Sequence, residues 1–268
     1  MRIALAVEYD GRPFCGWQSQ HGGCSVQDAL EAALAQIAGH AVRVTAAGRT
    51  DAGVHAAIQV VHFDTDAARP ASAWVRGANA HLPDAVAILW AQEVAADFHA
   101  RFSARERSYR YLLLNRAVRP AIGSGRVGWF HLPLQLAPMR EAAALLVGEH
   151  DFSAFRAAEC QARTAVRTVT RLTVERHGDL LVFDVWANAF LHHMVRNLVG
   201  SLVYVGKGKH PPHWIRDVLE GRDRNRAAPT FAADGLYLSS VRYAPPHTLP
   251  SEAARPLEAV LPGPGALR

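Results

Sequence analysis

The sequence predicts an α+β protein made of two related halves, each with a mostly antiparallel sheet and helices packed on one face. Two observations predict this class. Strand-like and helix-like runs follow the order β-α-β-β-α-β in the first half, and the theme returns in the second. Such ferredoxin-like halves leave the opposite sheet face free, as the RNA-recognition fold does. We expect an N-terminal half over 1–104, a C-terminal half over 105–243, a cleft between them, and an irregular proline-rich tail over 244–268.

Hydrophobic periodicity and cap residues define the elements of the first half. An aliphatic run predicts a strand over Ile3–Tyr9. Apolar residues at helical spacing predict a helix after the glycine-rich loop 10–24, with Ser25 as its N-cap and Gly39 just past its end. The other expected elements are two strands, a helix and a further strand, over Val42–Ala46, Ile58–Phe63, Pro70–Ala80 and Val86–Val94.

The second half begins with a basic strand over Ser108–Asn115 and ends with a strand over Leu236–Arg242. Aliphatic residues line one side of a predicted helix over Phe190–Tyr204, and Arg196 lies on another side. The other expected elements are strands over Val127–Phe130, Val166–Arg176 and Leu180–Ala187 and helices over Leu136–Val147 and Trp214–Leu219.

Positive charge is concentrated in one stretch of the chain. The formal net charge is +5, and the segment 101–126 holds seven arginines against one acidic residue, Glu106. The guanidinium group binds phosphate through two hydrogen bonds and stacks on bases, so this stretch favours nucleic-acid binding. The alternative is a solvated strand face in an arginine-preferring chain, since only two of its 29 basic residues are lysines.

Neither a membrane-spanning segment nor a metal site is expected. No apolar run approaches the roughly 20 residues needed to cross a bilayer, and the first residues do not resemble a signal peptide. Cys15, Cys24 and Cys160 make neither a disulfide framework nor a zinc ligand set. For the adjacent His192 and His193 we expect no metal, because neighbouring residues on a helix do not face each other. We therefore expect a cytoplasmic, metal-free protein.

The loop 47–57 is the strongest candidate for a functional site. Gly48 and Gly53 bracket an Arg-Thr-Asp trio between two apolar strands. Because glycine permits positive φ and close backbone approach, the loop can hold Arg49 and Asp51 in a fixed arrangement. A plain connection between strands needs only about two to five residues. The alternative is a solvated turn with a surface ion pair worth under about 1 kcal/mol.

Tyr109 and Tyr111 share one face of the basic strand, and Arg110 lies on the other, because side chains alternate along a strand. The tyrosines are either core residues or platforms on which bases stack. Arg196 is either a surface cation or the charge partner of a carboxylate.

Nine stretches, in order along the chain, resemble the tRNA pseudouridine synthase A family. The most specific is Gly48-Arg49-Thr50-Asp51-Ala52-Gly53-Val54-His55, which is similar to the family's signature loop. The resemblance runs from about Ile3 to Tyr243 and departs at Ser108, where relatives often carry a basic residue. The other stretches are Glu8–Gly11, Gly16–Gln18, Ser25–Gln27, Asp97–Ala104, Tyr109–Tyr111, Asp151–Arg156, His192–Asn197 and Gly235–Leu238.

The resemblance implies the pseudouridine synthase fold and an isomerase that converts uridine to pseudouridine in the anticodon stem-loop of tRNA, at tRNA positions 38, 39 or 40. It implies a homodimer that needs neither metal nor organic cofactor. It also implies that Asp51 is the catalytic nucleophile, that Tyr109 packs against the target base, and that Arg49 helps to flip and replace it. Arg196 would pair with the Asp51 carboxylate. The RNA backbone would be held by Arg101, Arg105, Arg107 and Arg110.

Two other classes of function remain as alternatives. A non-catalytic RNA-binding module needs the arginines of the basic segment but not Asp51. A glycoside or nucleoside hydrolase needs a second carboxylate near Asp51, which the loop does not supply.

Overall fold

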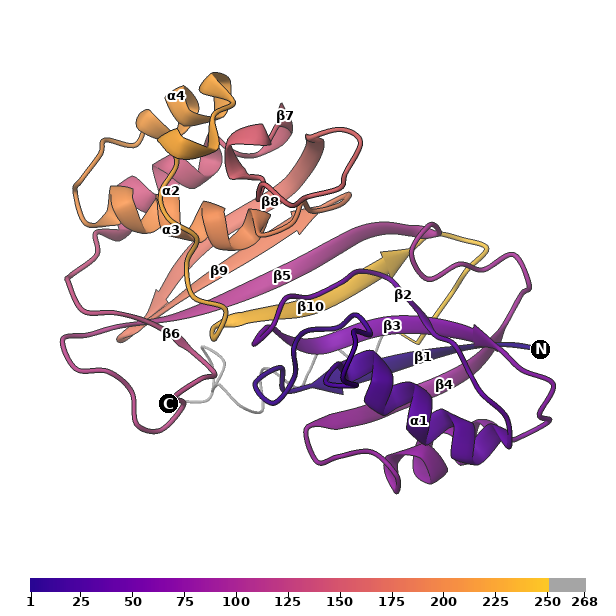
Figure 1. The fold of residues 1–268 in the computed structure, drawn as a ribbon. Coiled ribbons are helices and arrows are strands. Elements are labelled where there is room, and N and C mark those ends of the chain that lie inside the picture. The colour runs from indigo at the N-terminus through magenta and orange to yellow at the C-terminus, as the bar shows by residue number, and fades with distance from the viewer. Residues whose placement is uncertain (251–268) are drawn as a thin grey trace. The chain divides into compact units, whose positions relative to one another are not determined.

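The computed structural model describes residues 1–250 of the chain (Figure 1). The chain divides into two compact units. Unit 1 comprises Met1–Arg105 together with the described residues from Tyr237 onward, and unit 2 comprises Glu106–Leu236. Each unit contains a sheet and helices, which confirms the predicted α+β class. Within residues 1–250, the helices are all too short or too polar to cross a bilayer.

The sheet of unit 1 has the order β4-β1-β3-β10, and the short β2 (Thr45–Ala46) also pairs with β3. Strand β1 (Arg2–Tyr9) runs antiparallel to both β3 (His55–Asp64) and β4 (Val86–Val94). Strand β10 (Leu236–Tyr243) runs parallel to β3. The sequence predicts this last strand in the C-terminal half. Its partner in unit 1 depends on a pairing across most of the chain, which a local pattern does not reveal.

The helix α1 (Val26–Ala38) of unit 1 forms as predicted. A complete capping box begins at Ser25, and Gly39 ends the helix with a φ of 76°. Within the expected helix 70–80, the residues Ala73–Gly77 form a π-helical turn.

Both faces of the unit 1 sheet are covered, so the predicted free face is wrong for this unit. Every residue of β1 from Ile3 to Val7 is buried. The small side chains of Ala4 and Ala6 leave room for the buried ring of Phe98, and the partly buried Leu249 packs against the same cluster. The segments that follow β4 and β10 therefore occupy the face that we expect to be open.

The sheet of unit 2 has the order β5-β9-β8-β7, and β6 (Gly128–Phe130) pairs with β5 in parallel. Strands β5 (Ala104–Asn115), β9 (Leu180–Ala187), β8 (Val166–His177) and β7 (Gly148–Asp151) pair antiparallel. Buried residues alternate with partly exposed ones along β9, as one covered face requires. The sequence does not predict β7, because its four residues carry no apolar pattern.

Three helices accompany this sheet in unit 2 (Figure 1): α2 (Leu136–Ala144), α3 (Met194–Gly206) and α4 (Trp214–Gly221). Helix α3 is buried over most of its length. The sequence predicts that this helix starts at Phe190. It starts at Met194, because His193 has a left-handed φ of 61° and lies outside the helix.

Candidate functional site

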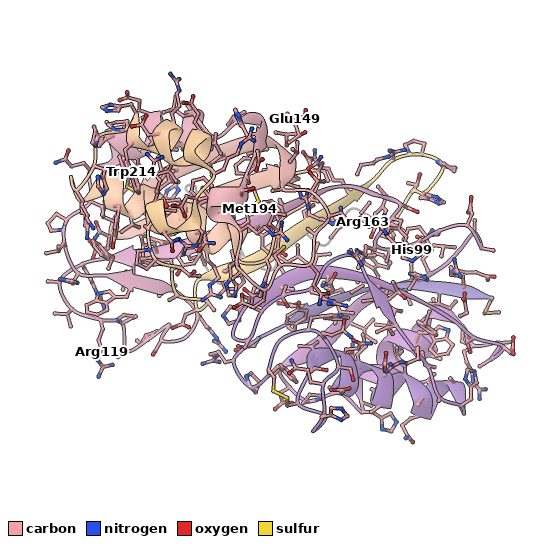
Figure 2. The ribbon with its side chains drawn as sticks, turned by 45° about the horizontal axis from the view of Figure 1, so that its top comes forward. His99, Arg119, Glu149, Arg163, Met194 and Trp214 are labelled. Atoms are coloured by element: carbon pink, nitrogen blue, oxygen red, sulfur yellow. A yellow bond between two sulfur atoms is a disulfide. The ribbon has the colours of Figure 1, made fainter. Side chains whose placement is uncertain are left out.

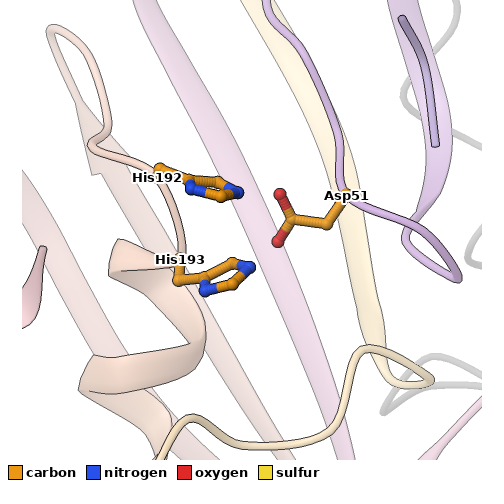
Figure 3. A group of neighbouring side chains, drawn as sticks. All are labelled: Asp51, His192 and His193. Atoms are coloured by element: carbon orange, nitrogen blue, oxygen red, sulfur yellow. The ribbon is translucent and has the colours of Figure 1, made fainter. Parts of the chain in front are cut away.

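Asp51 lies in the loop between β2 and β3 of unit 1, and Figure 3 shows its half-buried side chain extending from that loop. The Val54 N–H donates to the Asp51 carbonyl oxygen at 3.1 Å, which closes a tight turn. Gly53 has a φ of 77°, the positive value that a type II turn needs at its third residue. The turn therefore fixes the backbone from which the carboxylate projects.

A buried polar network supports the Asp51 loop from within unit 1. The phenol of Tyr9 and the hydroxyl of Thr50 form a hydrogen bond of 2.7 Å, and both side chains are buried. Burial raises the pKa of Tyr9 far above its ordinary value, although hydrogen bonds with Thr50 and Gln59 act in the opposite direction. Gln59 donates from Nε2 to the Gly48 carbonyl oxygen at 2.6 Å. The network thus contacts the loop at Gly48 and Thr50, both on the N-terminal side of Asp51.

The segment 15–24 packs against the same loop. The Trp17 N–H donates to the Thr50 carbonyl oxygen at 3.0 Å, and the Trp17 ring lies 5.8 Å from the ring of Tyr9. Gly16 has a φ of 103°, and a Cβ placed on it would lie 2.9 Å from the Thr50 carbonyl oxygen. Glycine is required at position 16 for its backbone conformation and for the close approach of the segment 15–24 to the Asp51 loop.

A disulfide joins Cys15 to Cys24, with Cα atoms 5.6 Å apart. Cys160 is the free cysteine among residues 1–250. The sequence analysis expects no disulfide framework and does not predict this single bridge. The loop between them turns back on itself, with the Cys15 N–H donating to the Cys24 carbonyl oxygen at 3.0 Å, and this brings the two side chains together. The bridge closes the loop that carries Gly16 and Trp17.

A second carboxylate, Asp10, lies at the edge of this loop region. Arg12 donates to it from Nε at 2.9 Å and from Nη2 at 2.5 Å, and the Nδ1 of buried His55 lies 3.2 Å from its Oδ1. Burial alone would raise the pKa of Asp10, but the hydrogen bonds from Arg12 and the charge of His55 outweigh burial and lower it well below its usual range. A Cβ on Gly11 would lie 2.1 Å from the Val54 carbonyl oxygen, so the backbone at Gly11 also packs closely against the Asp51 loop.

The arginines predicted to contact RNA differ in their surroundings. Arg49, beside Asp51 in its loop, is exposed, as are Arg101 and Arg105. Arg107 donates to the Asn188 carbonyl oxygen at 3.0 Å. Arg110 makes two hydrogen bonds to the carboxylate of Asp184, at 2.7 and 2.9 Å. A phosphate must therefore compete with Asp184 for Arg110.

Tyr109 and Tyr111 share the buried face of β5 in unit 2, at 9% and 0% exposed, as strand alternation predicts. The Tyr109 ring packs edge-on against Phe190 with ring centres 5.0 Å apart. Arg196 of α3 is half-buried and donates from Nε to the Phe231 carbonyl oxygen at 2.8 Å. Arg196 is therefore anchored to the protein and is not a plain surface cation.

His192 and His193, also drawn in Figure 3, precede α3 and do not lie on it. Their rings contact each other, with centres 4.0 Å apart. Our reason for expecting them to point apart, a shared helix, is therefore wrong. The left-handed backbone at His193 turns the two rings toward each other.

Sequence reasoning misses the residues that hold the Asp51 loop. Gln59 offers a signal, because it is a polar residue inside an otherwise apolar strand, and it proves fully buried. Tyr9 and Trp17 lie in the family-like stretches Glu8–Gly11 and Gly16–Gln18, but nothing in those stretches indicates a contact with the Asp51 loop.

The chain matches a family model described as tRNA pseudouridine synthase over residues 5–103 and 142–244. The tRNA pseudouridine synthase A of Thiobacillus denitrificans is 61% identical over 255 residues, which cover 95% of this chain and 98% of that protein. The same enzyme of Nitrosomonas europaea is 59% identical over 261 residues, covering 97% of this chain and 96% of that protein. A solved structure described as a Cbf5-Nop10-Gar1 complex is 14% identical and covers 75% of this chain and 44% of that chain, with a TM-score of 0.36.

The matched ranges include some candidate residues and leave others out. Arg49, Asp51 and Arg101 lie in the first matched range, and Arg196 lies in the second. Tyr109 and three of the arginines lie between the two ranges, at positions 105, 107 and 110.

Proposed function

Because the chain belongs to the tRNA pseudouridine synthase A family, we propose that it isomerises uridine to pseudouridine in tRNA with Asp51 as the nucleophile. Asp51 supplies the carboxylate of the family-like loop. The observation that favours its role is that three contacts hold the loop in place: the Tyr9–Thr50 hydrogen bond and the hydrogen bonds from Gln59 and Trp17. A solvated turn needs no such support.

The reaction requires a group such as this carboxylate. The bond between ribose C1′ and uracil N1 breaks, a bond between C1′ and C5 forms, N1 gains a proton, and the C5 hydrogen leaves as a proton. The sum is redox-neutral. Asp51 can attack C6, attack C1′, or remove the 2′ proton of the ribose, and each route needs an ionised carboxylate.

Seven further residues have roles in this proposal, which rests on the family resemblance. Arg49 helps to flip the target nucleotide and fills the space it leaves, since it is exposed and two residues from Asp51. Tyr109 packs against the flipped base, and Arg196 pairs with the Asp51 carboxylate. Arg101, Arg105, Arg107 and Arg110 bind phosphates of the stem, with Arg110 the weakest contributor because Asp184 already binds it.

The same resemblance supports three finer proposals. The target uridines lie in the anticodon stem-loop, at tRNA positions 38, 39 or 40. The protein works as a homodimer, and it works in the cytoplasm. Neither a metal nor an organic cofactor takes part in the proposed reaction.

The proposal is tested with tRNA transcripts that carry tritium at uridine C5, because the label leaves as water only when C5 becomes bonded to C1′. We expect the wild-type protein to release tritium from transcripts with uridine at position 38, 39 or 40. We expect no release from transcripts with cytidine at all three positions. A folded Asp51→Ala variant should release none from either.

The outcomes separate the alternatives. A non-catalytic RNA-binding module binds the transcripts without releasing tritium. A nucleoside hydrolase liberates free uracil with its C5 label intact. If Asp51→Ala retains the wild-type rate, the assignment of Asp51 is wrong even if the protein is a synthase.

A further inference from the structure

The turn 98–103 of unit 1 presents an aromatic ring to solvent, and the reaction proposed above makes no use of it. Phe102 is 76% exposed, whereas Phe98 in the same turn is fully buried in the core. Single exposed apolar residues are common on proteins, so exposure alone indicates nothing. The surroundings of Phe102 carry the argument, because a histidine ring and a guanidinium group lie against its ring.

The turn that carries Phe102 has a fixed backbone. Ser103 and His99 bond to each other twice, from the Ser103 N–H to the His99 carbonyl oxygen at 2.9 Å and from the His99 N–H to the Ser103 hydroxyl at 3.0 Å. The N–H groups of Arg101 and Phe102 both donate to Nδ1 of His99 at 3.2 Å. The Ala100 N–H donates to a histidine of β3 at 3.1 Å. All five N–H groups from 99 to 103 are therefore paired.

The Phe102 ring stacks on one neighbouring ring and is otherwise mostly exposed to solvent. The imidazole of His99, labelled in Figure 2, lies under it with ring centres 4.3 Å apart and planes 29° apart. The guanidinium carbon of Arg101 lies 5.6 Å from the ring centre. Burial, together with the charges of Arg2 and Arg101, lowers the pKa of His99, so at neutral pH its Nδ1 is free to accept the two N–H groups. A base can stack on an exposed ring that is held in place, and a neighbouring cation can bind the phosphate beside that base.

We propose that Phe102 is a stacking platform for an unpaired base of the tRNA substrate, and that Arg101 contacts the phosphate next to that base. The proposal rests on the proposed function, because a tRNA substrate supplies both groups. A second copy of this chain is the other occupant to consider. RNA is favoured because seven arginines and one acid occupy 101–126, and a like-charged copy would bring such a segment with it.

The experiment measures the Kd of a tRNA transcript for three variants of position 102 by fluorescence anisotropy. Phe102→Leu keeps an apolar side chain but removes the ring, whereas Phe102→Tyr and Phe102→Trp keep a ring. We expect Phe102→Leu to weaken binding about 5- to 100-fold, as loss of one stacked base does, and the two aromatic variants to stay within about twofold of wild type. Ile122→Ala removes a similarly exposed side chain elsewhere and serves as the control.

Two results overturn the proposal. One is a Phe102→Leu protein that binds tRNA as tightly as Phe102→Tyr. The other is a change in its oligomeric state by sedimentation velocity, which assigns the ring to a copy of the chain. Because tritium release by the wild-type protein is measured separately, failure here is distinguishable from failure of the proposed function.

Discussion

The Asp51 loop depends on buried polar side chains that take no part in the proposed chemistry. The Tyr9 phenol and the Thr50 hydroxyl form a hydrogen bond, and both side chains are buried. A buried polar group that loses its partner costs more free energy than the hydrogen bond itself contributes. These residues therefore affect the site through the backbone that presents the carboxylate.

Tyr9→Phe should lower the free energy of unfolding by about 1–3 kcal/mol, because the Thr50 hydroxyl is left buried without its partner. Thr50→Val combined with Tyr9→Phe should cost less than the sum of the two single changes, because neither polar atom remains. Urea unfolding of the four proteins measures this. Additive effects would show that the two hydroxyls do not interact.

His62 should make stability depend on pH. Burial, together with the positive charges of Arg2 and His99, lowers the pKa of His62 to about 4, while Asp64 acts in the opposite direction. In the unfolded chain its pKa is near 6.5, so between about pH 6.5 and 4 the unfolded chain binds a proton that the folded chain does not. The free energy of unfolding should therefore fall as the pH falls through this range.

His62→Asn is the matching variant, because the asparagine oxygen can replace Nδ1 as the acceptor of the Ala100 N–H. Its urea midpoint should fall less steeply than that of the wild type over the same pH range. Equal slopes for the two proteins would contradict the assignment of the shift to His62.

The elements show which parts of the fold local sequence patterns predict. Helix α1 forms where Ser25 and Gly39 place its ends, because capping is a local interaction. The start of α3 does not follow from its apolar stripe, because His193 adopts a left-handed conformation that no pattern marks. The strand β10 is predicted as a strand but not as a partner of β3, since strand pairing over this separation depends on the whole fold.

The candidate site divides in the same way. A resemblance in sequence singles out Asp51 and Arg49, because both lie in one short and specific motif. The Cys15–Cys24 bridge and the Gly16 contact are missed, because both depend on how the loop 15–24 turns back on itself. The ion pair of Arg110 with Asp184 cannot be predicted either, because it depends on the register of β5 and β9.

The loop 15–24 offers a matched pair of glycines that tests its contact with the Asp51 loop. Gly16 and Gly22 have similar φ values, 103° and 107°, so alanine is strained at both. Only at Gly16 would the new Cβ meet another chain segment, at 2.9 Å from the Thr50 carbonyl oxygen, whereas no atom lies within 4 Å at Gly22.

Gly16→Ala should therefore reduce the rate of tritium release far more than Gly22→Ala does. A displacement of about 1 Å at a catalytic group costs on the order of 100-fold in rate. Rates at saturating tRNA, compared with urea midpoints of both variants, separate a shifted loop from general instability. Equal rates for the two variants would show that the contact does not position Asp51.

At the scale of the whole molecule, the exposed arginines of unit 1 do not lie on the sheet face that the sequence predicts for RNA binding. The sheet of unit 1 is covered on both faces, so the free sheet face that the sequence predicts for RNA is not available there. The exposed cations Arg49, Arg101 and Arg105 instead lie on loops or at the start of a strand. We therefore expect RNA binding by unit 1 to depend on loops that the sheet positions, and its affinity to fall as salt rises.

The central claim, that the Asp51 carboxylate performs the chemistry and does not merely bind RNA, is tested most directly by Asp51→Asn. This variant keeps the shape of the side chain and removes its charge. We expect its Kd for tRNA to stay within about threefold of wild type, while the single-turnover rate of tritium release falls by about 10,000-fold or more, as loss of a nucleophile does. Tritium release within about tenfold of wild type, at unchanged Kd, would contradict the account.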